Sequence, residues 1–164
     1  MDLFVIIHGK AEESSEEQDD STRTLTKRGR KEIKEIGRWM RKEKFRFDAI
    51  ASSPLMAANE TAGIIARILD RKDWLVVWDE LAPDGDMDTV CYHAAQFSND
   101  ASILIVGHEP ALSALISRII SRGGTTSVIF SKGSLAKIKN FSFDREPSGD
   151  LQWLLNSKHM VTKR

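Results

Sequence analysis

The sequence lacks several features that mark specialised classes of protein. Its one cysteine, Cys91, cannot form a disulfide within the chain, which favours a reducing compartment. Its net charge is zero, with 24 Lys and Arg against 24 Asp and Glu, which argues against a general nucleic-acid or membrane-surface binder. No apolar run approaches a membrane span, and the N-terminus lacks the pattern of a signal peptide. These absences predict a cytoplasmic protein that binds neither nucleic acid nor membrane.

The residues that are present are sufficient for one folded domain. The chain has 164 residues, of which 41% are hydrophobic, and this excludes a mostly disordered protein. We find no repeat or linker and expect a single domain over residues 1–164. Charge is distributed unevenly, because an acidic stretch at 12–20 precedes a basic stretch at 22–46. We interpret these as a solvated loop and a solvated helix face. The alternative is a loop that shapes access to an anion site.

Short apolar runs alternate with helical patterns along the chain. Runs at 3–7, 47–51, 74–78 and 102–106 are typical of buried strands. Helices are expected to begin at Thr26, at Ser53-Pro54, at Asp86 and near Pro110. The pattern predicts an α/β fold in three layers, α/β/α, around a largely parallel sheet. Two late strands, at 134–138 and 151–155, could add an antiparallel edge, with a turn between them around Asp144, Pro147 and Gly149.

Two of the four histidines follow predicted strands directly, and both adjoin a glycine. His8 precedes Gly9 after the first strand, and His108 follows Gly107 after the fourth. Ligands of such sheets bind beyond the carboxyl ends of the strands. A single histidine there is more often structural, but a pair suits phosphoryl transfer, with one imidazole as nucleophile and the other holding the phosphoryl oxygens. Glu80, after the third strand, is the candidate for protonating the leaving group. No third ligand accompanies the histidines at metal-binding spacing, so no metal or cofactor is predicted.

Several segments, in this order and spacing, resemble the histidine phosphatase superfamily, and within it the SixA-type phosphohistidine phosphatases. The segments are Phe4-Val5-Ile6-Ile7-His8-Gly9-Lys10-Ala11, Arg23-Thr24-Leu25-Thr26-Lys27-Arg28-Gly29, Ser53-Pro54 with Thr61, Glu80-Leu81-Ala82-Pro83-Asp84-Gly85-Asp86 and Val106-Gly107-His108-Glu109-Pro110. The resemblance implies a phosphoglycerate-mutase-like fold. It also implies that His8 is transiently phosphorylated, that His108 binds the phosphoryl group and that Arg23 lies at the phosphate site.

The sequence departs from the family pattern at two arginines that clamp phosphate in active members. The family's Arg-His-Gly reads Ile7-His8-Gly9 here, and the arginine expected three residues after Pro54 is Ala57. An arginine that stabilises a phosphoryl-transfer transition state is worth about 10³–10⁵ in rate. We therefore expect other groups to bind the phosphate. The candidates are Arg23, Lys10, Gly9 and Ser53, with Lys27 and Arg28 as further cations that could turn inward.

Three hypotheses about function stay open at this point. The first is a phosphohistidine phosphatase that acts through His8, with activity reduced by the missing arginines. The second is a degenerate relative that binds phosphate or a phosphoprotein without efficient turnover. The third is an unrelated doubly wound binding domain whose histidines are structural. The partner expected under the first two is a protein that carries phosphohistidine, or a small phosphorylated ligand. The sequence predicts no oligomeric state.

Overall fold

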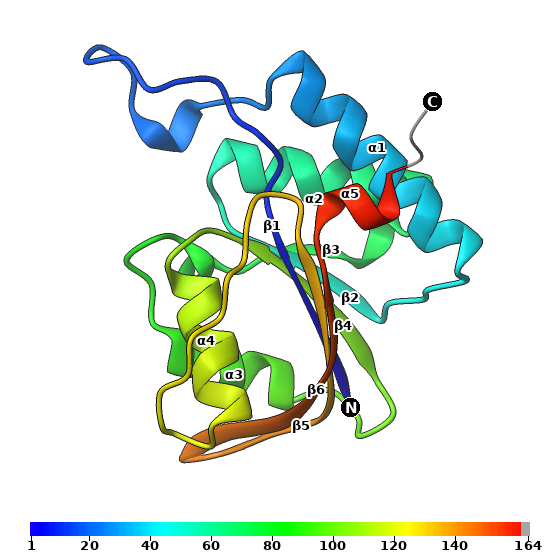
Figure 1. Cartoon of the computed structure of the whole chain (residues 1–164), viewed down its shortest axis with the longest axis vertical. Coiled ribbons are helices and arrows are strands. Elements are labelled where there is room, and N and C mark those ends of the chain that lie inside the picture. Colours follow the sequence, from blue (N-terminus) through cyan, green and yellow to red (C-terminus); the bar gives the residue numbers. More distant parts are fainter. Residues whose placement is uncertain (162–164) are drawn as a thin grey trace.

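The computed structural model describes residues 1–161 and contains a six-stranded sheet in the order β3-β2-β4-β1-β5-β6 (Figure 1). Its strands are β1 (Asp2–Ile7), β2 (Ala49–Ser52), β3 (Leu75–Val77), β4 (Ser102–Gly107), β5 (Leu135–Asp144) and β6 (Glu146–Leu155). The first four are parallel to one another, whereas β5 runs antiparallel to β1 and β6 antiparallel to β5. The predicted α/β fold with a largely parallel sheet and an antiparallel edge is confirmed.

Helices cover both faces of this sheet and give the three predicted layers. The helices are α1 (Lys27–Lys42), α2 (Met56–Ile68), α3 (Met87–Ala95), α4 (Ala111–Ile120) and α5 (Ser157–Met160), with short 3-10 turns η1 (Asp20–Thr22), η2 (Lys72–Trp74) and η3 (Asp79–Leu81). In Figure 1, α1, α2 and α5 lie on one side of the sheet and α3 and α4 on the other. In the described chain, no helix combines the length and the hydropathy needed to cross a bilayer.

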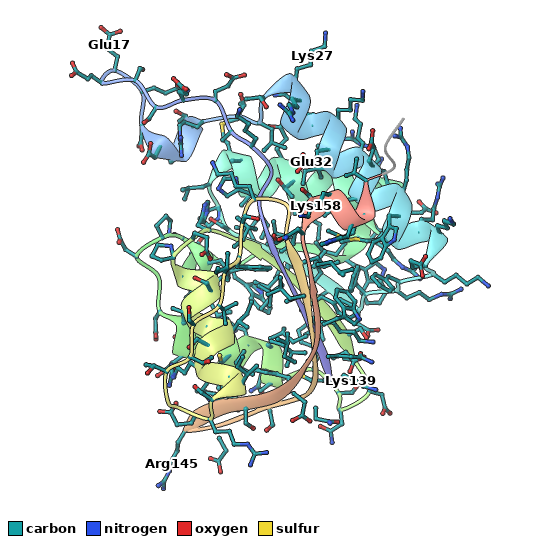
Figure 2. All side chains as sticks on the ribbon, in the orientation of Figure 1. Glu17, Lys27, Glu32, Lys139, Arg145 and Lys158 are labelled. Carbon is teal, nitrogen blue, oxygen red and sulfur yellow. The ribbon has the colours of Figure 1, made fainter. Side chains whose placement is uncertain are left out.

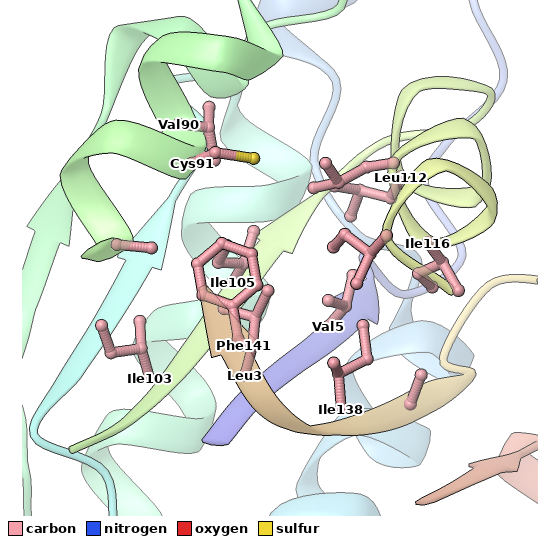
Figure 3. Close-up of a cluster of buried hydrophobic side chains, with 14 of the residues drawn as sticks. Leu3, Val5, Val90, Cys91, Ile103, Ile105, Leu112, Ile116, Ile138 and Phe141 are labelled. Atoms are coloured by element: carbon pink, nitrogen blue, oxygen red, sulfur yellow. The ribbon is translucent and has the colours of Figure 1, made fainter. Parts of the chain in front are cut away.

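The first strand shows why the sheet needs cover on both faces. Leu3, Val5 and Ile7 point into a buried cluster with α3 and α4. Phe4 and Ile6 point into a second cluster, with α1 and α2. Figure 3 shows the first of these clusters, with side chains of the sheet between the two helices. A strand buried on both faces has to be apolar along its length, so β1 stays apolar up to the residue before His8.

Three of the four predicted helix starts are confirmed, at Thr26, at Asp86 and near Pro110, and one is wrong. The hydroxyl of Thr26 accepts the N–H of Gly29 at 2.9 Å, and the carboxylate of Asp86 accepts the N–H of Asp88 at 3.0 Å. The helix expected at Ser53-Pro54 instead begins at Met56, without a side-chain cap. The reason is that Ser53, directly after β2, still donates its N–H to Val106 of β4 and is completely buried there.

The turn predicted between the two late strands is also wrong in its extent. The strands run on to Asp144 and Glu146, and the chain reverses at Arg145, which has a φ of 63°. Pro147 lies inside β6 and pairs with Phe143. Since β6 is the edge of the sheet, a residue without an N–H is tolerated there.

Candidate active site

The neighbouring strands β2, β4 and β1 bring together three predicted site residues, Ser53, His108 and His8, each of which follows one of these strands. The N–H of His8 donates to the carbonyl of Gly107 at 3.1 Å, and the N–H of Ser53 donates to the carbonyl of Val106 at 3.0 Å. Parallel pairing therefore continues one residue past the strands and fixes the backbone of the site. His8, Ser53 and His108 lie at one edge of the sheet because β1, β4 and β2 are adjacent there.

The two imidazole rings face one another at this edge. Their centroids are 5.0 Å apart, with an angle of 59° between the ring planes. His8 is 6% exposed and His108 is 7% exposed. Nδ1 of His8 lies 2.6 Å from the carbonyl oxygen of Gly9. Because a carbonyl oxygen only accepts hydrogen bonds, Nδ1 carries the hydrogen, and Nε2 of neutral His8 holds a free lone pair.

His108 is held by Ser53 and is uncharged near neutral pH. Its Nε2 lies 2.7 Å from the Ser53 hydroxyl oxygen, which also accepts the N–H of Leu55 at 3.2 Å. Burial, assisted by the charges of His8 and Arg23, lowers the pKa of His108 from 6.5 to about 4. Burial also lowers the pKa of His8, against the opposing effect of its bond to Gly9. Both rings are therefore neutral in the pH range where an imidazole nucleophile is needed.

Gly9 connects the nucleophile candidate to α2. Its N–H donates to the hydroxyl of Thr61 at 3.1 Å, and that hydroxyl donates to the carbonyl of Ala57 at 2.7 Å. A Cβ at this position would lie 2.7 Å from Cγ1 of Ile33, so a larger residue would displace the loop from α1. Gly9 thus presents its carbonyl to His8, while its N–H fastens the loop to the first turns of α2.

Arg23 is the predicted cation whose charge acts on both site histidines. Its charge lowers the pKa of His8 and of His108. Nη1 donates to the carbonyl of Glu12 at 3.2 Å, and Nε lies 3.3 Å from Oδ1 of Asp20. That second contact lacks hydrogen-bond alignment, and the buried Nε has no hydrogen-bond partner within residues 1–161. The guanidinium therefore has hydrogen-bonding capacity left for an anion.

Within the described residues, the remaining predicted side chains form no hydrogen bond or ion pair with the imidazole pair. Lys10 is exposed, and its charge lowers the pKa of Lys132. Lys27 and Arg28 are exposed on the first turn of α1. Oε2 of Glu80 lies 3.7 Å from Nε2 of His93 on α3. Glu80 is not among the charges that shift the pKa of either site histidine.

The turn that carries Lys132 lies beside His8, because the N–H of Gly133 donates to the carbonyl of Ile7, and the sequence analysis missed this lysine. Its charge lowers the pKa of His8, and its own pKa is lowered by burial, by Arg23 and by Lys10. Site residues were expected after the carboxyl end of each strand, whereas Lys132 precedes the amino end of β5. Since β5 is antiparallel to β1, its amino end lies at the same edge of the sheet as His8. The predicted antiparallel edge was the signal that could have found it.

The two positions without arginine differ in their surroundings. Ile7 is 1% exposed and packs in the apolar cluster on the α3 and α4 face. Ala57 is 6% exposed and stands in the first turn of α2, linked through Thr61 to the loop after His8. In residues 1–161, no group of three or more His, Cys, Asp and Glu side chains is arranged to hold a metal ion.

Comparisons with known proteins agree with this geometry. The model of the histidine phosphatase superfamily (branch 1) matches residues 3–82. The chain is 25% identical to the phosphohistidine phosphatase SixA of Escherichia coli (strain K12) over 158 residues, which is 95% of this chain and 94% of the relative. A structure of the protein histidine phosphatase SixA complexed with tungstate matches with a TM-score of 0.83 and 25% identity, over 97% of this chain and 99% of the other. The alpha-ribazole phosphatase from Shigella flexneri shares the fold, with a TM-score of 0.66 and 19% identity over 100% of both chains. The chain is thus similar to members of the histidine phosphatase superfamily along nearly its whole length, and it has their phosphoglycerate-mutase-like fold.

Proposed function

We propose that this protein is a phosphatase that removes the phosphoryl group from a phosphohistidine on another protein, through a phosphorylated intermediate on His8. The observation that carries the proposal is the orientation of His8. Its Nδ1 is bound to the Gly9 carbonyl, so that Nε2 is free, and the ring of His108 lies 5.0 Å away between centroids. Similarity to SixA along nearly the whole chain supports the same substrate class.

In the first step, Nε2 of His8 attacks the phosphorus atom. A bond forms between Nε2 and phosphorus as the bond from phosphorus to the substrate imidazole breaks, and that imidazole leaves with a proton. His108 holds the phosphoryl group from the opposite side. The Ser53 hydroxyl accepts the N–H of Leu55 and lies 2.7 Å from Nε2 of His108, and we infer that it donates its own hydrogen to that nitrogen. Nδ1 of His108 then carries a hydrogen that can be donated to a phosphoryl oxygen.

In the second step, a water molecule attacks the phosphorus of phosphorylated His8. The bond from Nε2 to phosphorus breaks, inorganic phosphate leaves, and neutral His8 is restored. Arg23 supplies positive charge to the phosphoryl oxygens in both steps. The proposed donor of the proton that the leaving imidazole carries away is the carboxyl group of Glu80, which lies beside His93.

A second candidate function is binding of a phosphorylated partner without efficient turnover. The observation that favours it is the apolar environment of the arginine positions. Ile7 is packed inside the core, and the Ala57 side chain brings no charge to α2. Arginine contributes bidentate, charge-assisted hydrogen bonds to phosphate. The absence of both arginines lowers turnover more than it lowers binding of the phosphorylated partner if those bonds are stronger in the transition state than in the bound complex.

The test uses a histidine-containing carrier protein phosphorylated chemically with phosphoramidate. We expect the wild type to release inorganic phosphate and His8→Ala to release none above background, whereas the matched control His159→Ala, at an exposed histidine of α5, stays close to wild type. Equal rates for wild type and His8→Ala would refute the proposal. If neither hydrolyses the phosphoprotein but the wild type alone retains it, the second candidate function is supported instead.

The intermediate can be detected separately. After a brief reaction quenched in alkali, we expect an added phosphoryl mass on the peptide that contains His8, which is lost on acid treatment. Phosphorylation of any other residue would contradict the assignment of the nucleophile. Glu80→Gln tests the proton donor: slower first-step release of the carrier histidine, with phosphate binding unchanged, supports the role.

A further inference from the structure

We propose that Lys132 binds the phosphoryl group in place of the arginines missing at positions 7 and 57. The inference rests on the proposed function, since it names a ligand of the same site. Lys132 comes from the turn before β5, on the side of His8 away from β4, whereas an arginine at position 57 would come from α2. The phosphate would therefore be held by positive charge from a different direction.

The turn that carries Lys132 has a defined shape. The N–H of Ser134 donates to the carbonyl of Ser131 at 2.9 Å, and Gly133 has a φ of 72°. Those features define a four-residue turn with Lys132 at its second position and a left-handed residue at its third, where glycine is favoured. The hydroxyls of Ser131 and Ser134, 2.9 Å apart, close the turn a second time. The backbone that presents Lys132 is thus fixed by its own sequence.

Hydrogen bonds to β1 then fix this turn beside the nucleophile. The N–H of Gly133 donates to the carbonyl of Ile7 at 3.1 Å, and the N–H of Ile7 donates to the carbonyl of Ser134 at 3.3 Å. Ile7 is the residue directly before His8. On the far side, the Ser134 hydroxyl donates to Oδ1 of Asn156 at 3.1 Å. Lys132 is consequently attached, through two backbone bonds, to the strand end that carries His8.

The charges around Lys132 indicate a site for an anion. Lys132, Arg23 and Lys10 are close enough that the other two lower the pKa of Lys132, and within the described residues Lys132 forms no ion pair with a carboxylate. The largest cause of this shift is partial burial, although Lys132 as a whole residue is exposed and can be reached by an anion. Asp20 offsets part of the charge at Arg23, but none of the ion pairs among the described residues includes Lys132. Repulsion from Arg23 and Lys10 costs free energy at Lys132, and an arriving phosphoryl group would relieve it.

The experiment measures inorganic phosphate affinity by calorimetry and the kcat/KM for the phosphorylated carrier protein in the same variants. We expect Lys132→Ala to weaken both by about 10- to 100-fold, which is the range for one charge-assisted hydrogen bond. Lys132→Arg should keep most of both, because it keeps the charge. The matched control is Lys139→Ala, an exposed lysine of β5 at the opposite end of the paired strands (Figure 2), and we expect it to match wild type.

The outcomes separate this inference from the proposed function. If the wild type is active and Lys132→Ala equals Lys139→Ala in both measurements, Lys132 is not a phosphate ligand, and the function of His8 stands. If the wild type does not hydrolyse the phosphoprotein, the proposed function fails, and the phosphate affinities alone decide whether Lys132 is a phosphate ligand. Weaker binding only in Lys132→Ala then supports the inference, and equal or undetectable binding overturns it. Circular dichroism and thermal unfolding verify that each variant is folded.

Discussion

The low pKa of His108 predicts a loss of stability in mild acid. In the unfolded chain this imidazole binds a proton below about pH 6.5, whereas in the folded protein it does so only below about 4. Falling pH between these values therefore favours the unfolded state, in which more protons are bound. A tenfold change in a protonation equilibrium is worth about 1.4 kcal/mol. With a pKa of about 4 in the folded protein, His108 therefore lowers the free energy of unfolding by roughly 2.5 kcal/mol when the pH falls from neutral to about 4.5.

Urea unfolding of wild type and His108→Gln at neutral pH and at about pH 4.5 measures this contribution. The variant retains every other titratable group, so the difference between the two pH dependences isolates His108. We expect the wild type to lose about 2–3 kcal/mol more than the variant on acidification. Parallel losses would refute the reasoning, because they would mean that His108 takes up its proton equally in the folded and unfolded states. A change in stability at neutral pH alone is no test, since the substitution also changes packing.

Four further predictions follow from the same contacts. Ala57→Arg should raise phosphate affinity in calorimetry and restore part of what Lys132→Ala loses. Ile7→Arg should lower the free energy of unfolding in urea by at least about 3 kcal/mol, because it buries an unpaired charge in the apolar cluster. Thr61→Val should cost about 1–3 kcal/mol by leaving the buried N–H of Gly9 without its partner, and should lower kcat, measured with the phosphorylated carrier protein. The acidic limb of kcat/KM should lie below pH 6.5, as the lowered pKa of His8 requires, and Lys132→Ala should move it to higher pH.

The fold was predictable because its signals are local. Apolar runs buried on both faces, such as β1 and β4, are short and continuous, and capping residues such as Thr26 and Asp86 lie directly before their helices. Two features were not local. The hydroxyl of Ser53 has the chemistry of a helix cap, but in the structure it is bound to His108, a residue far along the chain. The extension of β5 and β6 depends on their pairing with each other, which outweighs the turn-forming residues near Pro147.

The site was predictable in part for the same reason. His8, His108 and Ser53 stand at the ends of parallel strands, where strand position alone predicts a shared edge. The contacts that give them chemical roles join distant segments: Gly9 to Thr61, Arg23 to Glu12, and the turn at Lys132 to β1. A lysine in a serine- and glycine-rich turn has no local signal that distinguishes it from a solvated surface residue.

The acidic stretch at 12–20 supports both interpretations offered by the sequence, at different residues. Glu17 stands at the outer end of the loop and points away from the protein (Figure 2), as a solvated charge does. Asp20, at the other end of the stretch, lies 3.3 Å from Nε of Arg23. A phosphoryl group that reaches Arg23 therefore has to compete with a carboxylate, whereas Lys132 has no such competitor among the described residues. Neutralising the exposed Asp20 should strengthen phosphate binding through Arg23, and the same change should leave the contribution of Lys132 unaltered.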